Sequence, residues 1–591
     1  MLKTIGVVAV VLMASVSYAA RPKTTSNVFE TSNRPTTDSP IDKIVFHKLF
    51  SLNIHPACCS DSVFIRRVYL DVIGTLPTAK EAREFIEDRD VRNKRRLLID
   101  RLLERDEFAD YWSMRWSDVL RIKAEFPVNL WPNAAQAYHR WVHSSLATNK
   151  SYDKFVRELL TSSGSNFRVG PVNFYRAIQT RTPDGIATAV ALTLMGSRAE
   201  AWPAERRAGM APFFSQIGFK PTAEWKEEIV FWDPCHLNKV PGNAVPGRAA
   251  LPMPTGSTAA VAGTTAQQAV ALTAPAPLKA VFPDGTEVTI PPDRDPRDVF
   301  ADWLIRPENP WFAKSSINRI WAWLLGRGII HEPDDIRDDN PPTYPSLLAY
   351  LEKEFIDSGY NTKAVYRLIL NSRTYQASSL MRVKNPKAEV YFGHYLVRRL
   401  DAEVLIDAIN KVTGTTDLYT SAIPEPFTYI PADMPAVAIA DGSITSDFLA
   451  LFGRSARATG LVNERSTKPV PGQWLHMLNS SHIQNKLESG TWIKTLTGSG
   501  NRSLQDIINE LYLTILSRYP TPEEMTSIEE YLFLTVRTND QAAGGRYAKA
   551  PAASGKFGKP TLPQLSETQK RDNSIDIAWA LINSTEFLYR H

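Results

Sequence analysis

The chain has 591 residues, of which 43% are hydrophobic and 22% are charged. This length exceeds the roughly 250 to 300 residues that one hydrophobic core usually serves, so we expect two or more domains. Lys and Arg number 68 against 63 Asp and Glu, a formal net charge of +5. So weak an excess, with no concentrated basic stripe, argues against a nucleic-acid-binding protein.

The first 40 residues have the pattern of an export signal followed by a flexible leader. Lys3 gives a positive start, the run from Ile5 to Val16 is apolar and uncharged, and Ala19 closes a stretch of small residues. We expect cleavage after Ala19 and export to the periplasm or the cell surface. The alternative is an uncleaved N-terminal anchor, but a membrane span needs about 20 apolar residues and this run is shorter. Residues 20–40, rich in Thr, Ser and Pro, are predicted to be flexible.

Helical signals begin at Ile41 and continue through residues 41–236, the predicted N-terminal helical domain. Apolar residues from Phe64 to Val72 recur with a helical period, and Gly74 follows as a C-terminal cap. Thr78 and Glu81 have the spacing of a capping box that opens the next helix. Further helices are predicted at 95–103, 112–121 and 134–147.

The second half of the chain is separated from the first by a segment of different composition. Residues 241–277 are rich in Pro, Ala, Thr, Gly and Val, as linkers are, and residues 279–290 alternate apolar and polar side chains around Asp284-Gly285. The predicted fold is therefore mainly α, with one small β-hairpin at 279–290. The predicted segments are a linker with the hairpin at 237–295, a second helical domain at 296–418, a loop region at 419–446 and a C-terminal helical region at 447–591.

An internal repeat is indicated near the two ends of the chain. Tyr69 precedes Thr78 by the spacing that separates Tyr512 from Thr521, and both threonines begin a capping box. Leu102 also precedes Glu107-Phe108 by the interval between Leu581 and Glu586-Phe587. We interpret this as a duplicated helical hairpin that packs on itself; shared capping chemistry in two unrelated helix pairs is the alternative.

The chain has three cysteines, Cys58, Cys59 and Cys235. In an exported protein either Cys58 or Cys59 is a candidate partner for Cys235 in a disulfide, and buried free thiols are the alternative. No two cysteines have the C-x-x-C spacing of common zinc and redox sites, and we expect no metal site.

Several long strings of residues resemble a known pair of domains. The segments FIRRVYLDVIGTLPT at 64–78, ADYW at 109–112 and RWSD at 115–118 resemble the planctomycete cytochrome-associated domain of unknown function, PSCyt-two. A second group of strings resembles PSD-one, the domain that usually follows PSCyt-two. They are NPWF at 309–312, NRIW at 318–321, GRG at 326–328, DDIRDDNPP at 334–342, NSRTYQ at 371–376 and RRLDAE at 398–403. The resemblance extends over nearly all of the mature chain.

The resemblance implies an exported protein from bacteria that degrade complex polysaccharides, with no established reaction. Many members carry a C-x-x-C-H haem attachment motif after a Leu-Gly pair. Here the corresponding residues 201–205, after Met195-Gly196, read AWPAE. Covalent haem needs two thiols and an imidazole ligand, so we expect no haem and no other cofactor, and electron transfer is disfavoured.

The densest acidic cluster is the set of candidate catalytic residues Asp334, Asp335, Asp338 and Asp339. Paired carboxylates can act as general acid and base on a glycosidic bond, or bind calcium, although the EF-hand pattern is absent. The simpler interpretation is that these side chains cap helices and fix a turn before Pro341-Pro342.

Aromatic and charged residues supply candidates for ligand binding. Trp112 and Trp116 lie four residues apart on one helix face and are expected in the core. Trp131, in a predicted loop, is the better candidate for a surface that stacks on a sugar. The other candidate ligand-binding residues are Arg337, Arg373, Arg398 and Asp401, which will form one site only if they converge with Arg319.

The spacing of the histidines and serines gives weak evidence for a catalytic or metal site. His139 and His143 have a helical zinc-binding spacing, but no third ligand is apparent, so a structural pair is favoured. His476 and His482 flank Ser480-Ser481, which leaves a Ser–His nucleophile open.

The leading hypothesis is a non-catalytic module that binds a glycan or an exported protein partner within a polysaccharide-processing system. A carboxylate-dependent glycan hydrolase that uses the 334–339 cluster is the alternative, and electron carriage is a disfavoured third.

Overall fold

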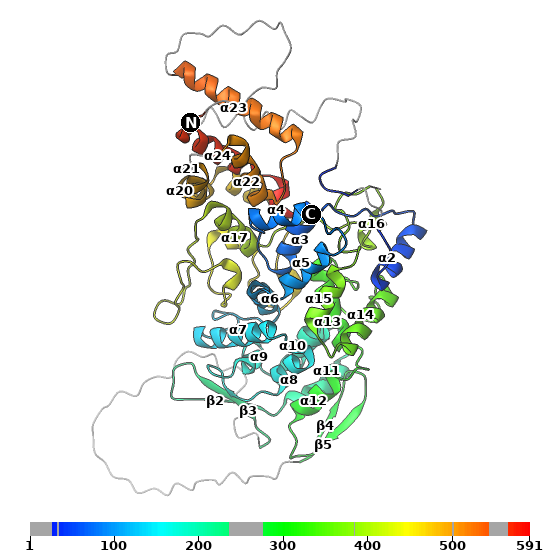
Figure 1. The fold of residues 1–591 in the computed structure, drawn as a ribbon. Helices are drawn as coiled ribbons and strands as arrows, with labels where there is room; N and C mark the ends of the chain where they lie inside the picture. The colour runs from blue at the N-terminus through cyan, green and yellow to red at the C-terminus, as the bar shows by residue number, and fades with distance from the viewer. Residues whose placement is uncertain (1–26, 32–34, 236–275, 383, 499–501, 543–564) are drawn as a thin grey trace, which may run out of the picture.

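The computed structural model describes residues 27–31, 35–235, 276–382, 384–498, 502–542 and 565–591. Its described part is dominated by helices, with three small sheets, which confirms the mainly α prediction (Figure 1). The cleavage site and most of the 237–295 linker lie outside the described residues. Within the predicted leader, Phe29 and Glu30 have defined places: the backbone at 29–31 pairs with that at 58–60, and Glu30 bonds Arg382.

The first half of the chain forms helices close to the ranges that the apolar periods predicted. They are α2 (Pro40–Ser51), α3 (Asp61–Val72), α4 (Ala79–Glu87), α5 (Lys94–Leu103), α6 (Asp106–Val119), α7 (Pro132–Ala147), α8 (Tyr152–Thr161), α9 (Asn173–Arg176), α10 (Pro183–Met195) and α11 (Ala204–Met210). Thr78 and Glu81 form the expected capping box of α4. Gly74 has a φ of +63°, the left-handed conformation that glycine adopts without strain.

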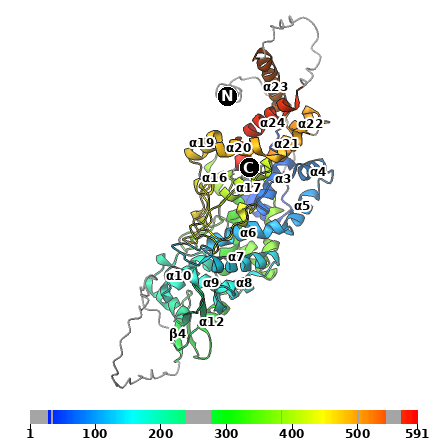
Figure 2. The ribbon, with the colours of Figure 1, turned by 90° about the vertical axis from the view of Figure 1, so that its left-hand side faces the viewer.

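The second half is also built from short helices joined by long loops. They are α12 (Pro296–Leu304), α13 (Phe312–Leu325), α14 (Pro345–Asp357), α15 (Thr362–Leu370), α16 (Pro386–Val390), α17 (Ala402–Thr413), α18 (Asp447–Leu451), α19 (Pro471–Asn479), α20 (Ser481–Ser489), α21 (Thr491–Gly498), α22 (Leu504–Leu516), α23 (Pro522–Ala542), α24 (Glu567–Ile582) and α25 (Thr585–Leu588). The molecule is elongated, with α23 towards one end and the strand β4 towards the other (Figure 2).

The strands form three separate antiparallel sheets. The predicted hairpin is confirmed as β4 (Leu278–Val281) paired with β5 (Glu287–Ile290). A sheet of order β1-β3-β2 was not predicted; its strands are β1 (Gly164–Ser165), β2 (Ile217–Pro221) and β3 (Glu228–Trp232). The third sheet joins residues far apart in sequence, β6 (Arg398–Arg399) and β7 (Tyr589–Arg590).

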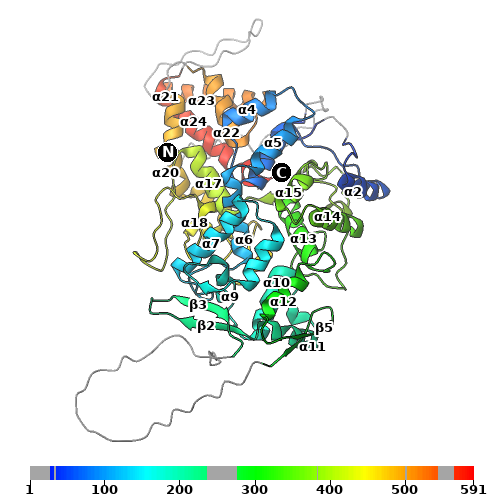
Figure 3. The same ribbon diagram turned by 60° about the horizontal axis from the view of Figure 1, so that its bottom comes forward.

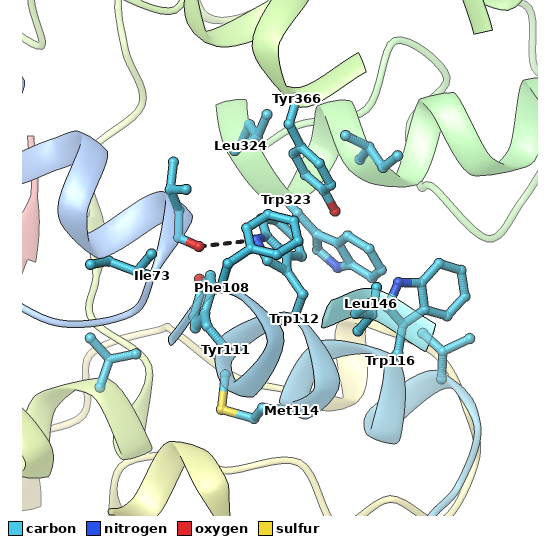
Figure 4. Packing of buried hydrophobic residues seen from close by; sticks show 14 of the residues in the cluster. Ile73, Phe108, Tyr111, Trp112, Met114, Trp116, Leu146, Trp323, Leu324 and Tyr366 are labelled. Carbon is cyan, nitrogen blue, oxygen red and sulfur yellow. Dashed lines mark hydrogen bonds between the residues drawn. The ribbon is translucent and has the colours of Figure 1, made fainter. Parts of the chain in front are cut away.

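The predicted core position of the helical tryptophans is confirmed. Trp112 and Trp116 are 1% and 3% exposed, and both rings contact Trp323 of α13 at centroid distances of 5.6 Å. Figure 4 shows this aromatic group between α6 and the helices of the second half, with the Trp112 indole N–H donating to the carbonyl of Val72 at 3.1 Å. One continuous cluster of buried apolar side chains therefore joins the two halves of the chain.

The two hairpins of the predicted repeat have matching ionic clusters. In the first, Arg105 bridges the capping-box acid Glu81 and Glu107 and lies over the ring of Tyr69. In the second, the corresponding acids and ring are Glu524, Glu586 and Tyr512, and the arginine between them is Arg518, which comes from a different position of the repeat, three residues before Thr521. Helix α4 packs on α22, and Arg83 of α4 bonds Glu510 of α22 at 2.7 Å. The two hairpins thus share side-chain chemistry and contact each other, which supports the duplication.

Candidate functional site

A cleft of about 680 Å³ lies between the segment that follows α10, the start of α13 and the residues at 336–342. These elements come from both halves of the chain, and α10, α11, α12 and α13 lie near one another in this part of the molecule (Figure 3). The cleft has the size of many small-ligand sites and is lined by both apolar and polar side chains. Residues 201–203, where the resemblance places a haem attachment motif, form part of its wall and carry no thiol or imidazole.

Backbone hydrogen bonds at the end of α10 fix one wall of the cleft. Gly196 ends the helix with a φ of +61°, and its carbonyl accepts from the N–H of Ile336 at 2.9 Å. The Ser197 hydroxyl donates to the carbonyl of Ile336 and accepts from the indole N–H of Trp202. A Cβ on Gly196 would lie 3.1 Å from both Ile336 and Ser315, so a larger residue would push the walls apart.

Two tryptophans give the cleft its aromatic surface. Trp202 is 9% exposed and is held by its bond to Ser197. Trp311 is half-buried and backed by Trp303 at a centroid distance of 5.9 Å. Asn309 accepts from the backbone N–H groups of Trp311 and Phe312, so its side chain fixes the start of α13. Trp311 is the more accessible of the two rings.

Charged groups of both signs surround these rings. The guanidinium of Arg206 lies 5.7 Å from the centre of the Trp202 ring, and Lys314 reaches the cleft from α13. Arg337 pairs with Asp335 at 3.0 Å and with Asp339 at 3.3 Å. Asp338 is exposed and makes no ion pair with any described residue. The cleft therefore offers hydrogen-bond donors and acceptors around an apolar floor.

The four acids of the 334–339 cluster do not form one site. Asp334 is buried, where one oxygen pairs with Arg319 at 2.8 Å and the other accepts from the N–H of Val462 at 2.6 Å. Arg319 also donates to the carbonyl of Thr193, so this pair joins α10, α13 and the 462 loop. Asp334 is a structural residue, and only Asp338 and Asp339 of the cluster line the cleft.

The other sequence candidates lie apart from the cleft. Trp131 is half-buried, and its ring contacts Phe427 at 5.3 Å and Lys226 at 5.9 Å. Arg373 bonds Gln376 beside α2, and Arg398 donates to the last carbonyls of α13. Of the candidates for ligand binding, the structure places only Arg337 at the cleft.

Asp401 is the centre of a buried ionic network that the sequence did not reveal. Its carboxylate pairs with Arg115 at 2.5 Å, Arg590 at 2.8 Å and Arg465 at 4.0 Å. Burial by itself would raise the pKa of Asp401, but Arg115, Arg590 and Arg465 lower it well below its usual range. Such a carboxylate stays ionised and holds its partners in place, which suits a structural role better than proton transfer.

The network continues through acids from both halves of the chain. Glu403 pairs with Arg465 and with Arg454 at 3.2 Å, and Asp118 of α6 pairs with Arg457 at 3.1 Å and with Arg465 at 2.9 Å. The charged residues of the strings at 115–118 and 398–403 thus meet in the interior. Arg115 was visible in its string, but Arg465 and Arg590 have no local sequence signal.

The three cysteines are free thiols, which was the alternative to the candidate disulfide. Cys58 and Cys59 are buried free thiols in extended segments that pair with Ala377 and Glu30, whereas Cys235 is exposed just after β3. The strand β3 lies in the lower part and the helix α3 in the upper part of Figure 1, and all three cysteines are free.

The histidine candidates give no three-ligand metal centre. His139 is buried, and its ring centroid lies 6.4 Å from that of His143, which bonds Asp110 at 3.1 Å. The Ser480 hydroxyl caps α20 by accepting from the backbone N–H of His482, so it is not poised as a nucleophile. Within the described ranges, no three His, Cys, Asp or Glu side chains converge as ligands, and no helix is long and apolar enough to cross a bilayer.

Comparison with known families agrees with this architecture. The model of PSCyt2, a protein of unknown function (DUF1549), matches residues 40–195, and that of PSD1, a protein of unknown function (DUF1553), matches residues 296–532. Searches of curated proteins and of solved structures found no match. The resemblance inferred from the strings is confirmed in its two domains and their order: a region that matches PSCyt2 is followed by a region that matches PSD1.

Proposed function

We propose that this protein is an exported binding module and that the cleft between α10, α13 and residues 336–342 binds a glycan. The observation that carries the proposal is the half-buried ring of Trp311 on the cleft wall, with Trp202 nearby and charged groups around both. Aromatic faces bind the apolar faces of sugars, while arginine and carboxylate side chains bond to hydroxyl groups. Both requirements are met here within one hollow.

The arrangement of the acids supports binding rather than hydrolysis. A glycosidase needs one carboxyl group that stays protonated near neutral pH, which burial or a neighbouring carboxylate provides. Asp338 and Asp339 are exposed, and Asp339 is paired with Arg337. Both carboxylate oxygens of Asp334 are bonded, one to Arg319 in an ion pair and the other to the backbone N–H of Val462. We therefore propose no catalytic role for the cluster.

The site of action that we propose, the periplasm or the cell surface, depends on the N-terminal signal pattern. In a polysaccharide-processing system, a module of this kind would hold a chain for enzymes that act on it. N-terminal sequencing of protein secreted by an expressing cell tests the location, and a mature N-terminus at Ala20 is expected.

The binding proposal is tested with immobilised neutral and sulfated glycans. We expect the mature protein to be retained by at least one of them. Trp311→Ala should weaken that binding by about tenfold or more, because an aromatic contact of about 1.4 kcal/mol corresponds to this factor. Trp131→Ala is the matched control, since Trp131 is also half-buried but lies outside the cleft.

Two results would overturn the proposal. If no glycan retains the protein, the proposal of glycan binding is wrong. If the protein turns over a glycan and Asp335→Asn or Asp338→Asn abolishes that activity, the protein is an enzyme and not a binding module.

A further inference from the structure

Two walls of the cleft each present one aromatic ring together with one cation. On the first wall Arg206, in the first turn of α11, follows Trp202 by four residues, and its guanidinium lies 5.7 Å from the centre of the Trp202 ring. On the second wall Lys314, in the first turn of α13, follows Trp311 by three residues, a spacing that makes helix residues neighbours. All four side chains line the same hollow. The cleft thus combines a ring and a positive charge in two places.

Neither cation has an acidic partner among the described residues. Arg206 and Lys314 are both half-buried, and within the described part of the chain their side chains form no ion pair or hydrogen bond. Glu352 of α14 is close enough for Lys314 to lower its pKa, but burial has the larger effect and raises that pKa. The cleft therefore removes two cations partly from water without supplying the counterion that such charges require.

The acids of the cleft do not balance these cations. Asp284 accepts from the indole N–H of Trp303 and from a backbone N–H, each at 2.9 Å, and Asp339 pairs with Arg337. Asp338 is the one carboxylate left free among the described residues that line the cleft. Helix α13 also begins here without an acidic residue in its first turn, so its dipole adds positive potential. The unpaired charge of the hollow is consequently positive.

We propose that the glycan of the cleft is anionic and that Arg206 and Lys314 bind its carboxylate or sulfate groups. This inference rests on the proposed glycan binding and names the class of ligand. The sugar ring would stack on Trp311, with its acidic substituents bonded to Lys314 on the same wall and to Arg206 on the other. Ionised acceptors form shorter and stronger hydrogen bonds with these donors than hydroxyl groups do. The two cations therefore select the charge of the ligand, and the ring selects a sugar.

The test compares charged and uncharged forms of the same glycan with the mature protein. Dextran sulfate is paired with dextran, and polygalacturonate with its methyl ester. We expect at least one charged form to bind about tenfold more tightly than its uncharged counterpart. Raising NaCl to about 0.5 M should remove most of this preference, because salt screens partly exposed charges. Preference for the sulfate, for the carboxylate or for both identifies the acidic group, and each of these results supports the proposal.

Variants locate the preference in the cleft. Arg206→Gln and Lys314→Gln should each weaken binding of the charged form by about tenfold, and binding of the uncharged form by less. Lys279→Gln is the matched control, since Lys279 is an exposed lysine of β4, which packs against α11, but it does not line the cleft. The control should bind the charged form like the wild type. Circular dichroism shows that each variant is folded before its affinity is compared.

The outcomes separate this inference from the proposed function. If the uncharged glycans bind as tightly as the charged ones, the cleft still binds a glycan, but the inference of an anionic ligand is wrong. It is also wrong if both cleft variants bind the charged form like the wild type, or if Lys279→Gln weakens binding as much as they do. If no glycan binds, charged or uncharged, the proposed function itself is overturned and the inference with it.

Discussion

The buried ionic network and the open cleft contain the same kinds of side chain in opposite environments. Asp401 is 1% exposed and is surrounded by three arginines, whereas Asp338 and Asp339 are exposed at the cleft. The network joins residues of the PSCyt2 and the PSD1 segments, whereas the cleft is lined by PSD1 residues and by residues that lie between the two segments. The difference teaches that burial, and not residue type, separates the charges that hold the two segments together from those that are free to meet a ligand.

The largest change in stability is expected when a buried acid of the network is replaced, and the same replacement at the cleft gives the comparison. Asp401→Asn removes one charge from the interior, so that Arg115 loses its carboxylate partner and Arg590 keeps only Asp71. It should lower the free energy of unfolding by about 3–5 kcal/mol. Asp339→Asn, which removes an exposed partner of Arg337, should change it by less than about 0.5 kcal/mol. Urea denaturation measures both, and equal losses would show that the network contributes no more than a surface pair.

The second test asks whether a buried pair acts as a unit. Arg319→Met leaves the Asp334 carboxylate uncompensated and should cost about 3–5 kcal/mol of stability. Adding Asp334→Asn removes that charge while an amide oxygen still accepts from Val462. The double variant should therefore recover about half of the loss or more. If the double variant loses as much stability as the two single variants added together, this coupling is contradicted.

The third test uses pH. Burial, with smaller contributions from Arg457 and His143, lowers the pKa of His139 from 6.5 to about 3. Between pH 6.5 and 3, His139 is therefore protonated in the unfolded chain but neutral in the folded chain. The stability that is present above pH 6.5 is lost as the pH falls towards 3. His139→Gln should remove about 1.4 kcal/mol of this loss per pH unit.

His143 supplies the control for the pH test. Its hydrogen bond to Asp110 raises its pKa, so its contribution is present at low pH and is lost as the pH rises. The His143 contribution is constant below pH 6.5, so His143→Gln should lower stability there without changing the acid slope, and should remove the loss of stability above pH 6.5. Denaturation curves at pH 4, 5, 6, 7 and 8 distinguish the two pH windows, and an unchanged acid slope in His139→Gln would contradict the assignment.

The smallest expected effect on stability belongs to the cleft. Asp338→Asn removes an exposed charge without an ion-pair partner among the described residues, so the free energy of unfolding should change by less than about 0.5 kcal/mol. Glycan retention should nevertheless weaken if the carboxylate accepts a sugar hydroxyl. A large loss of stability in this variant would place Asp338 with the structural acids.

The sequence by itself determined the helical class, most helix positions in the first half, the hairpin at 279–290 and the family. These features depend on neighbours in the chain: the apolar period from Phe64 to Val72, the capping pair Thr78 and Glu81, and the turn at Asp284-Gly285. The run from Ile229 to Trp232 contains the residue types of a strand, but its partners are remote, and the sheet that it forms was missed.

Only the tertiary structure decided which charged residues belong together. Asp334 and Asp338 stand four positions apart, yet one is buried against Arg319 and the other faces the cleft. The carboxylate of Asp401 meets Arg590, 189 positions away. Local spacing carries no information on such pairs, because the free energy of a charge depends on the dielectric and the partners that distant segments bring to it.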